Sequence, residues 1–155
     1  MPPNSSLPPA RTIAQRKRDT LAKLESQVDA WVASASAGGE AHLVPLSFWW
    51  DGEKVTFATR RRSITARNLA RAERARIALG PTRDVVIIEG PVDVTPLEDD
   101  ERLADAYAAA TGWDPRESTG RFVLMRVTPR HIQAWREVNE NVQDRDIMED
   151  GKWLA

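Results

Sequence analysis

The sequence predicts an α+β fold, mainly β, in which six antiparallel strands form a barrel with flanking helices. The pairs Gly38-Gly39 and Asp51-Gly52 separate extended runs of residues, and such pairs favour tight turns between strands. Strands joined by short turns pair antiparallel, because a parallel pair needs a long crossover connection. A barrel also leaves no strand at an unpaired edge.

The six expected strands are short segments that alternate with turn signals. The run "HLVPLSFWW" is apolar on both faces, which predicts that the second strand is buried on both sides. Pro45 has no N–H to donate, so we expect a bulge or an opening of the sheet there. Trp49 and Trp50 are adjacent and must point to opposite faces of this strand. The strands are expected at about 30–36, 41–50, 54–59, 75–80, 84–94 and 121–135, the last one interrupted near Pro129.

Three helices accompany these strands. An amphipathic helix is expected from Arg11 to about Val28, with Arg16 on its polar face. Ser63 is a good N-cap for a short second helix. The third helix starts among acidic residues and ends at Gly112, a stop signal. The remaining tail is polar, and its expected apolar anchors are Ile147, Met148, Trp153 and Leu154.

Composition limits the domain organisation and the chemistry. The 155 residues predict a Pro/Ser-rich disordered segment over 1–10 and one domain over 11–155. The chain has no cysteine, which excludes disulfides and a cysteine nucleophile and fits a cytoplasmic protein. Its two histidines, His42 and His131, are expected to be structural, so no metal site is predicted. No apolar run approaches the ~20 residues that span a bilayer.

Seven arginines and one glutamate occupy residues 57–76, although the net charge of the whole chain is only −1. Four interpretations compete: a phosphate site, a solvated helix face, a nucleic-acid surface and a membrane-surface helix. Nucleic-acid binding calls for a basic face with either a recognition helix or stacking aromatic residues, and Phe57 is the only aromatic residue here. The phosphate site is favoured because a strand ends at Thr59 and a helix capped by Ser63 follows a basic turn. Arginine forks and hydroxyl groups both match phosphate oxygens.

The order of several segments resembles a known family. "HLVPLSFWWDG", "KVTFAT", "SITARNL", "ARIALG" and "IIEGPVDV" follow one another as in the pyridoxamine 5'-phosphate oxidase-like flavoproteins, whose fold is a split β-barrel. The resemblance covers about 29–135 and is greatest to the actinobacterial group that uses FMN or the deazaflavin coenzyme F-420. It implies a homodimer with the cofactor in a groove between the subunits.

The resemblance also implies particular cofactor-binding residues. The ring would lie along the second strand, and Trp135 could come from the partner subunit. Many relatives have a lysine where this chain has Thr65, which implies weaker binding or a different cofactor preference. The implied ring contacts are Val44, Pro45, Leu46 and Ser47, and the implied phosphate contacts are Thr59, Arg60, Arg61, Arg62, Ser63 and Arg67.

The function implied by the resemblance is that of an oxidoreductase which transfers a hydride to or from a small organic substrate. A flavin-type cofactor carries that chemistry itself, so no catalytic side chain is assigned. A cofactor-binding carrier or sensor without turnover is the alternative from another functional class. A nucleic-acid-associated regulator that uses the basic stretch is a third hypothesis, and its binding would weaken steeply with salt.

Overall fold

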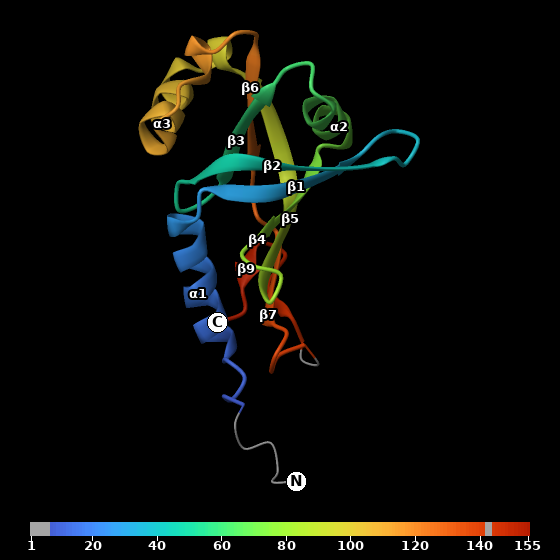
Figure 1. Cartoon of the computed structure of the whole chain (residues 1–155), viewed down its shortest axis with the longest axis vertical. Coiled ribbons are helices and arrows are strands. Elements are labelled where there is room, and N and C mark those ends of the chain that lie inside the picture. The colour runs from blue at the N-terminus through green and yellow to red at the C-terminus, as the bar shows by residue number, and fades with distance from the viewer. Residues whose placement is uncertain (1–6, 142–143) are drawn as a thin grey trace.

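The computed structural model describes residues 7–141 and 144–155 and consists mainly of antiparallel strands (Figure 1). Three α-helices and two short 3-10 helices accompany nine strands in these residues. The elements are α1 (Ile13–Ser26), β1 (Asp29–Ala35), β2 (Ala41–Trp50), β3 (Val55–Arg60), α2 (Ile64–Ala72), β4 (Arg74–Leu79), β5 (Asp84–Pro96), η1 (Leu97–Asp99), α3 (Glu101–Thr111), η2 (Pro115–Glu117), β6 (Phe122–Val127), β7 (His131–Arg136), β8 (Asp146–Glu149) and β9 (Lys152–Trp153).

Six of the strands close into a barrel. The ring runs β1–β2–β3–β6–β5–β4 and returns to β1, and every neighbouring pair is antiparallel. The first five strands of the ring begin and end within two residues of the predicted ones, whereas β6 is only the first part of the predicted strand 121–135. The predicted α+β fold with a six-stranded antiparallel barrel is therefore confirmed.

The long strand β5 holds the two halves of the barrel together. One of its edges pairs with β4, and its other edge pairs first with β7 and then with β6. The predicted last strand is thus β6 and β7 in line, interrupted by Thr128, Pro129 and Arg130. Opposite this interruption a Cβ on Gly90 would overlap the carbonyl oxygen of Thr128. Only glycine permits this close approach of the two backbones.

Two apolar clusters lie on opposite faces of the barrel wall. The larger cluster fills the interior, and Leu69 of α2 and Leu24 of α1 join it. The smaller cluster lies between α3 and the outer face of β3 and β6, where Tyr107 is fully buried. Trp50 packs against the interior cluster and Trp49 against the cluster under α3, so the two indoles point to opposite faces as predicted.

The expectation that β2 is buried on both sides is wrong for its first half. Leu43 is 59% exposed and Pro45 is also exposed, because none of the helices in residues 7–141 and 144–155 covers the outer face there. The predicted bulge at Pro45 is also absent, since Pro45 pairs in regular register with Trp31 of β1. The predicted opening of the sheet is present, because β2 pairs with β3 only from Phe48 to Trp50.

The polar tail contains a hairpin that the sequence analysis missed. β8 and β9 are joined by Asp150 and Gly151, both with positive φ, which is the D-G turn typical of two-residue hairpins. Ile147 and Met148 are buried as expected, and Trp153 packs against the interior cluster. Leu154 is exposed and therefore is not an anchor.

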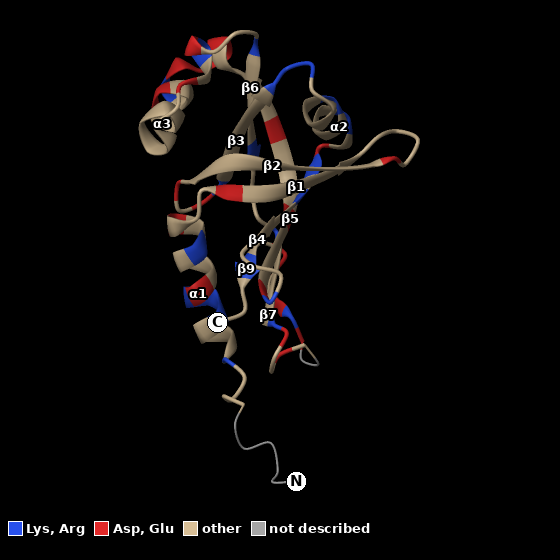
Figure 2. Cartoon of the chain, in the orientation of Figure 1, with Lys and Arg blue, Asp and Glu red and all other residues tan. Residues whose placement is uncertain are grey.

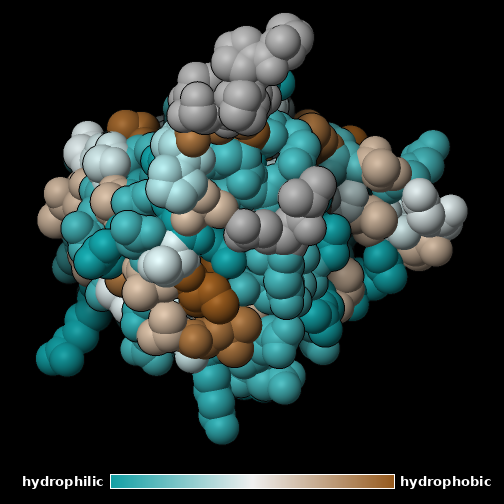
Figure 3. Space-filling view, turned by 90° about the horizontal axis from the view of Figure 1, so that it is seen from below, coloured by the Kyte–Doolittle hydropathy of each residue, from teal (hydrophilic) through white to brown (hydrophobic). Residues whose placement is uncertain are grey.

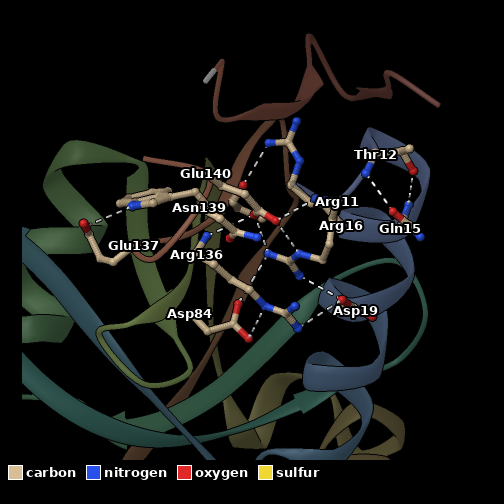
Figure 4. Close-up of polar contacts among 12 residues, drawn as sticks. Arg11, Thr12, Gln15, Arg16, Asp19, Asp84, Arg136, Glu137, Asn139 and Glu140 are labelled. Carbon is tan, nitrogen blue, oxygen red and sulfur yellow. Dashed lines mark hydrogen bonds and ion pairs between the residues drawn. The ribbon is translucent and has the colours of Figure 1, made fainter. Parts of the chain in front are cut away.

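A buried ion-pair network fastens α1 to the lower end of the barrel (Figure 4). The Glu140 carboxylate is fully buried and accepts hydrogen bonds from the Arg11 guanidinium at 2.8 and 2.9 Å and from the Arg11 backbone N–H at 2.9 Å. Arg16 is only 4% exposed and donates to the carbonyls of Ala134 and Asp144, so its placement on the polar face was wrong. Seen from below, the molecule presents a mostly hydrophilic surface with a small hydrophobic patch (Figure 3).

The beginning of the chain is only partly described. Residues 1–6 of the predicted disordered segment 1–10 lie outside the described residues. The carbonyls of Pro8 and Pro9 accept hydrogen bonds from the side-chain amide of Asn139. The segment before α1 is thus attached to the loop that also carries Glu140. Among the described residues, no helix has the length and hydropathy that crossing a bilayer requires.

Removing the charge of Glu140 is expected to destabilise the fold in a pH-dependent way. Burial alone would raise the pKa of Glu140, but hydrogen bonds from Arg11 and the Arg136 backbone lower it to about 2. This contribution is present above the unfolded-state pKa of 4.5 and is lost as pH falls toward 2. Glu140→Gln should therefore lower the free energy of unfolding by about 3 kcal/mol at pH 7, measured by urea denaturation.

The matched control is Glu117→Gln, because Glu117 is exposed. It should change stability by less than about 0.5 kcal/mol at any pH. A difference between wild type and Glu140→Gln that stays constant down to pH 2 would contradict the assigned role of the carboxylate.

Gly90→Ala is expected to disrupt the junction of β6 and β7. The new Cβ meets backbone rather than a movable side chain, so the strands must separate. We expect a loss of about 3 kcal/mol or more, or no folded protein, measured by thermal denaturation. Gly38→Ala is the control, since its Cβ would have no neighbour closer than 3.9 Å. Equal melting temperatures for the two variants would refute the close-approach argument.

Candidate functional site

The arginine-rich stretch forms the turn between β3 and α2, at the upper end of the barrel in Figure 2. β3 ends at Arg60, and the Arg60 carbonyl accepts from the Ser63 N–H at 2.9 Å, which closes the turn. Ser63 then caps α2 by accepting from the Ala66 N–H at 3.0 Å. Asn68 and Leu69 are buried and hold the helix against the barrel.

The two predicted hydroxyl groups lie together at the start of α2. The Oγ1 of Thr59 lies 3.2 Å from the Oγ of Ser63, within hydrogen-bond distance. With Ser63 accepting from Thr59 and from Ala66, its own hydroxyl proton stays available to another acceptor. The backbone N–H groups of Ile64 and Thr65 have no acceptor in the described part of the chain, as expected for the first turn of a helix. These groups can meet an anion.

The arginines of the turn are not equivalent. Arg60 donates to the Thr119 carbonyl at 3.0 Å and lies over the Phe122 ring, so it is committed to the fold. Arg61 pairs with Glu98 at 3.4 Å, and because both side chains are about half exposed this pair is weak. The exposed guanidinium groups of Arg62 and Arg67 have no acidic partner among the residues the structure describes. They are the charges available to a ligand.

A groove of about 640 Å³ opens beside this turn, with basic walls. Arg60, Arg61 and Arg62 line one side, and Gly120 and Arg121 line the other. Gly120 has a φ of +98°, and a Cβ there would lie 2.8 Å from Nη1 of Arg60, so the glycine lets the guanidinium lie against the loop. The groove thus brings together the predicted arginine triplet and one arginine distant in sequence.

The sequence analysis missed Gly120 and Arg121. They reach the turn because β3 pairs with β6, which places Arg60 opposite Phe122, and because the Arg61 N–H donates to the Arg121 carbonyl at 2.9 Å. The alternation of polar and apolar residues in the predicted last strand did not show which of its residues lie opposite which residues of the third strand. Only that register could have revealed these two residues.

The predicted ring-contacting residues lie where β2 leaves β3. The Phe48 N–H donates to the Val28 carbonyl on the β1 side. Because the backbone groups of every second residue point to the same edge of a strand, those of Val44 and Leu46 also face β1. Those of Pro45 and Ser47 face the opposite edge, which carries no strand in the described residues. The proline thus sits where the sheet needs no donor. We call the segment from Val44 to Ser47 the open edge.

Tyr107 of α3 reaches this open edge from above. Its hydroxyl donates to the Ser47 carbonyl at 3.4 Å, and burial raises its pKa to about 12. The phenol therefore stays protonated and acts as a donor at neutral pH. No feature of the isolated helix sequence distinguished Tyr107 from a simple core residue.

Trp135 is not brought to this site within one chain. It pairs with Val85 near the start of β5, whereas Thr59 is linked through Val123 to Pro96 at the other end of that strand. At the usual rise per residue this separation along β5 is up to about 36 Å. Arg145 also lies over the Trp135 ring, 4.1 Å from its centroid.

Other candidates have structural roles. Nε2 of His131 lies 2.6 Å from Asp146 and joins β7 to β8, as expected for a structural histidine. Thr65 is buried, so it presents no group to the groove. In the second half of the arginine run, Arg74 and Arg76 pair with Glu89 of β5.

Comparisons with known proteins agree with this architecture. Solved structures with the same fold include an FMN-binding protein related to pyridoxamine 5'-phosphate oxidase from Nostoc punctiforme (19% identity, 87% of each chain covered, TM-score 0.60). An F420 reductase (17% identity, 72% of this chain and 93% of that chain, TM-score 0.59) is also similar. General Stress Protein 26 from Bacillus anthracis is similar too (18% identity, 77% and 92%, TM-score 0.62).

No curated protein matches the chain. The family model described as pyridoxamine 5'-phosphate oxidase matches residues 18–136, which include the whole barrel ring. The match covers most of the sequence and includes both the arginine turn and the open edge. The chain therefore belongs to the pyridoxamine 5'-phosphate oxidase family.

Proposed function

We propose that this protein is an oxidoreductase that binds a flavin-type cofactor, FMN or coenzyme F-420, and transfers a hydride to or from a small organic substrate. The observation that carries the proposal is the convergence at the start of α2. Two hydroxyl groups and the backbone N–H groups of the first helical turn gather there, and Arg62 and Arg67 beside them have no acidic partner among the described residues. This turn follows β3, the strand that β2 leaves at the open edge. That donor set suits a phosphate next to a flat ring.

The phosphate is assigned to the turn between β3 and α2. Ser63 donates its hydroxyl proton, Thr59 fixes the orientation of Ser63, and Arg62 and Arg67 supply charge. Arg60 and Arg61 contribute less, since each already has a partner within the chain. Of the implied phosphate contacts we therefore propose Ser63, Arg62 and Arg67 as the principal ones.

The ring is assigned to the open edge. The Ser47 N–H and the Pro45 carbonyl face this edge and are directed as hydrogen-bond partners for the polar rim of a flavin-type ring. Val44 and Leu46 supply the adjoining side chains, and Leu46 packs against the barrel interior. A rigid backbone edge of this kind positions a ring more precisely than a loop does.

The bound cofactor would supply the hydride chemistry, so the chain needs no acid–base residue of its own. What its residues contribute is binding, orientation and exclusion of water. Tyr107 holds the Ser47 carbonyl and thereby fixes the open edge from the α3 side. This division of roles fits a redox enzyme better than a hydrolase.

A homodimer is part of the proposal. The outer face of β1 and β2 carries Trp31 and Leu43, which are 49% and 59% exposed, on a hairpin that extends away from the barrel (Figure 1). Exposed apolar residues grouped on one face mark an interaction surface. A second copy would cover them, and the Trp135 contact implied by the resemblance would then come from the partner subunit. We also propose a cytoplasmic location, in line with the absence of cysteine.

Substitutions of Ser63 separate helix capping from phosphate binding. Aspartate is a good N-cap, so Ser63→Asp should keep the melting temperature but repel a phosphate. Ser63→Ala should cost about 1 kcal/mol of stability. We expect FMN and F-420 titrations, followed by fluorescence, to show saturable binding of at least one cofactor to the wild type and none to Ser63→Asp.

The absorption spectrum of the bound cofactor then identifies it, because a deazaflavin absorbs at shorter wavelength than FMN. Reduction of varied organic acceptors by the reduced complex distinguishes an enzyme from a carrier or sensor. Failure of both cofactors to bind at tens of micromolar would refute the proposal. An Arg71→Gln control should bind normally, since Arg71 donates to the Ala35 carbonyl away from the groove.

Leu43→Asp is expected to convert the dimer into a monomer. A charge at this exposed apolar position costs nothing in the single chain but must be desolvated in the interface. Light scattering after size-exclusion chromatography measures the mass, and cofactor affinity should fall with it. Val138→Asp is the matched control, because Val138 is equally apolar and 50% exposed but lies in the loop after β7. A wild-type monomer, or equal effects of both variants, would contradict this interface.

A further inference from the structure

A separate hollow of about 310 Å³ lies at the other end of the open edge from the arginine groove. It sits between the end of α1, β2 and the end of α3, on the left side of Figure 1. Its volume lies at the lower end of the range for small-molecule sites. The lining residues are Leu24, Glu25, Ser26, Gln27, Val28, Ser47, Phe48, Trp50, Ala110, Thr111 and Trp113.

The walls of this hollow are aromatic and carry no positive charge. The exposed ring of Trp113 and the partly buried Trp50 provide flat apolar surface, whereas Phe48 is only 6% exposed. Glu25 is the only charged residue of the lining. Four other hollows of the described chain each include at least one arginine. An anion is therefore disfavoured here, while a flat uncharged molecule can stack on the rings.

Two large apolar side chains at the rim of the hollow are exposed to solvent. Val28 is 67% exposed and Trp113 is 37% exposed. Trp113 is nevertheless held in place, because its Nε1 donates to Ser118 at 3.2 Å and its ring meets the edges of Tyr107 and Phe122. A fixed, exposed indole beside a hollow is typical of a binding site for an aromatic molecule.

The hollow also adjoins the proposed ring site. Ser47 belongs both to the open edge and to the lining, and Tyr107, which holds the Ser47 carbonyl, lies on the helix that forms the upper wall. A molecule in the hollow would thus reach the end of the open edge without meeting the arginine groove.

We propose that this hollow binds a planar, uncharged organic molecule. Its role as the place where the organic substrate lies beside the cofactor ring rests on the proposed function, but binding itself does not. The polar groups of Gln27 and Thr111 at the lining provide hydrogen-bond partners for carbonyl or hydroxyl groups of that molecule.

The test uses 1,4-naphthoquinone as the probe and the full chain without added cofactor. Binding is measured by equilibrium dialysis, and the absence of cysteine excludes reaction of the quinone with a thiol. Ala110→Trp places an indole in the hollow, whereas Ala109→Trp places the same indole on the neighbouring exposed position outside the lining. We expect about tenfold or greater loss of affinity for Ala110→Trp and less than about twofold change for Ala109→Trp.

Melting temperatures of both variants confirm that they fold. If Ala110→Trp fails to fold, Trp113→Ala replaces it, and the same loss of affinity is expected. An absence of binding to the wild type, or equal affinities for Ala110→Trp and Ala109→Trp, would overturn the proposal. The anionic 1,4-naphthoquinone-2-sulfonate should bind at least about tenfold more weakly than the uncharged quinone, and equal affinity would overturn the assigned class of ligand.

Measurements on the cofactor-loaded protein distinguish ligand binding in the hollow from a role of the hollow in hydride transfer. If the hollow holds the substrate, Ala110→Trp raises the KM for an uncharged quinone while the affinity for FMN or F-420 is unchanged. Quinone binding that persists in a chain that binds neither cofactor would retain the site and remove its role in hydride transfer. An unchanged KM in Ala110→Trp would likewise overturn the substrate role.

Discussion

The barrel depends on a close approach of two backbones at Gly90. Because that residue has no side chain, Thr128 can lie against β5, and β6 and β7 can follow one another along the same edge. β5 then pairs with three strands, and the ring closes through β4 and β1. The closed ring includes the pairing of β3 with β6, whose register brings Arg121 beside Arg61.

Closure on one side leaves a strand edge free on the other. β2 pairs with β1 from Ala41 to Ser47 but with β3 only from Phe48 onward, so Pro45 and Ser47 direct backbone groups to an edge that carries no strand in the described part of the chain. Unpaired strand edges are normally covered or blunted, because they attract other chains. Here a proline removes one donor and Tyr107 takes one acceptor, and the remaining short edge is open to a ligand.

Much of this arrangement could be predicted from local sequence. Turn pairs, the Ser63 cap and the interruption at Pro129 are short-range signals, and they located the six strands and the arginine turn. What could not be predicted depends on long-range contacts. Arg16 looks solvent-facing by helical period, yet distant carbonyls bury it. Arg121 joins the groove only through the register of β3 with β6. The sequence pattern predicts that Leu43 is buried, but none of the described helices covers that face of β2.

The two hollows beside the open edge have opposite chemistry, and this restricts what can bind between them. One end offers the arginines of the turn before α2, and the other offers indole faces with a single carboxylate. A molecule with an anionic tail and a flat ring can lie in only one direction along β2, with its tail at Arg62 and its ring toward Ser47. A second, uncharged molecule then meets the ring rather than the tail. For the two proposed ligands, charge alone would therefore set this order, without any side chain that recognises their reaction.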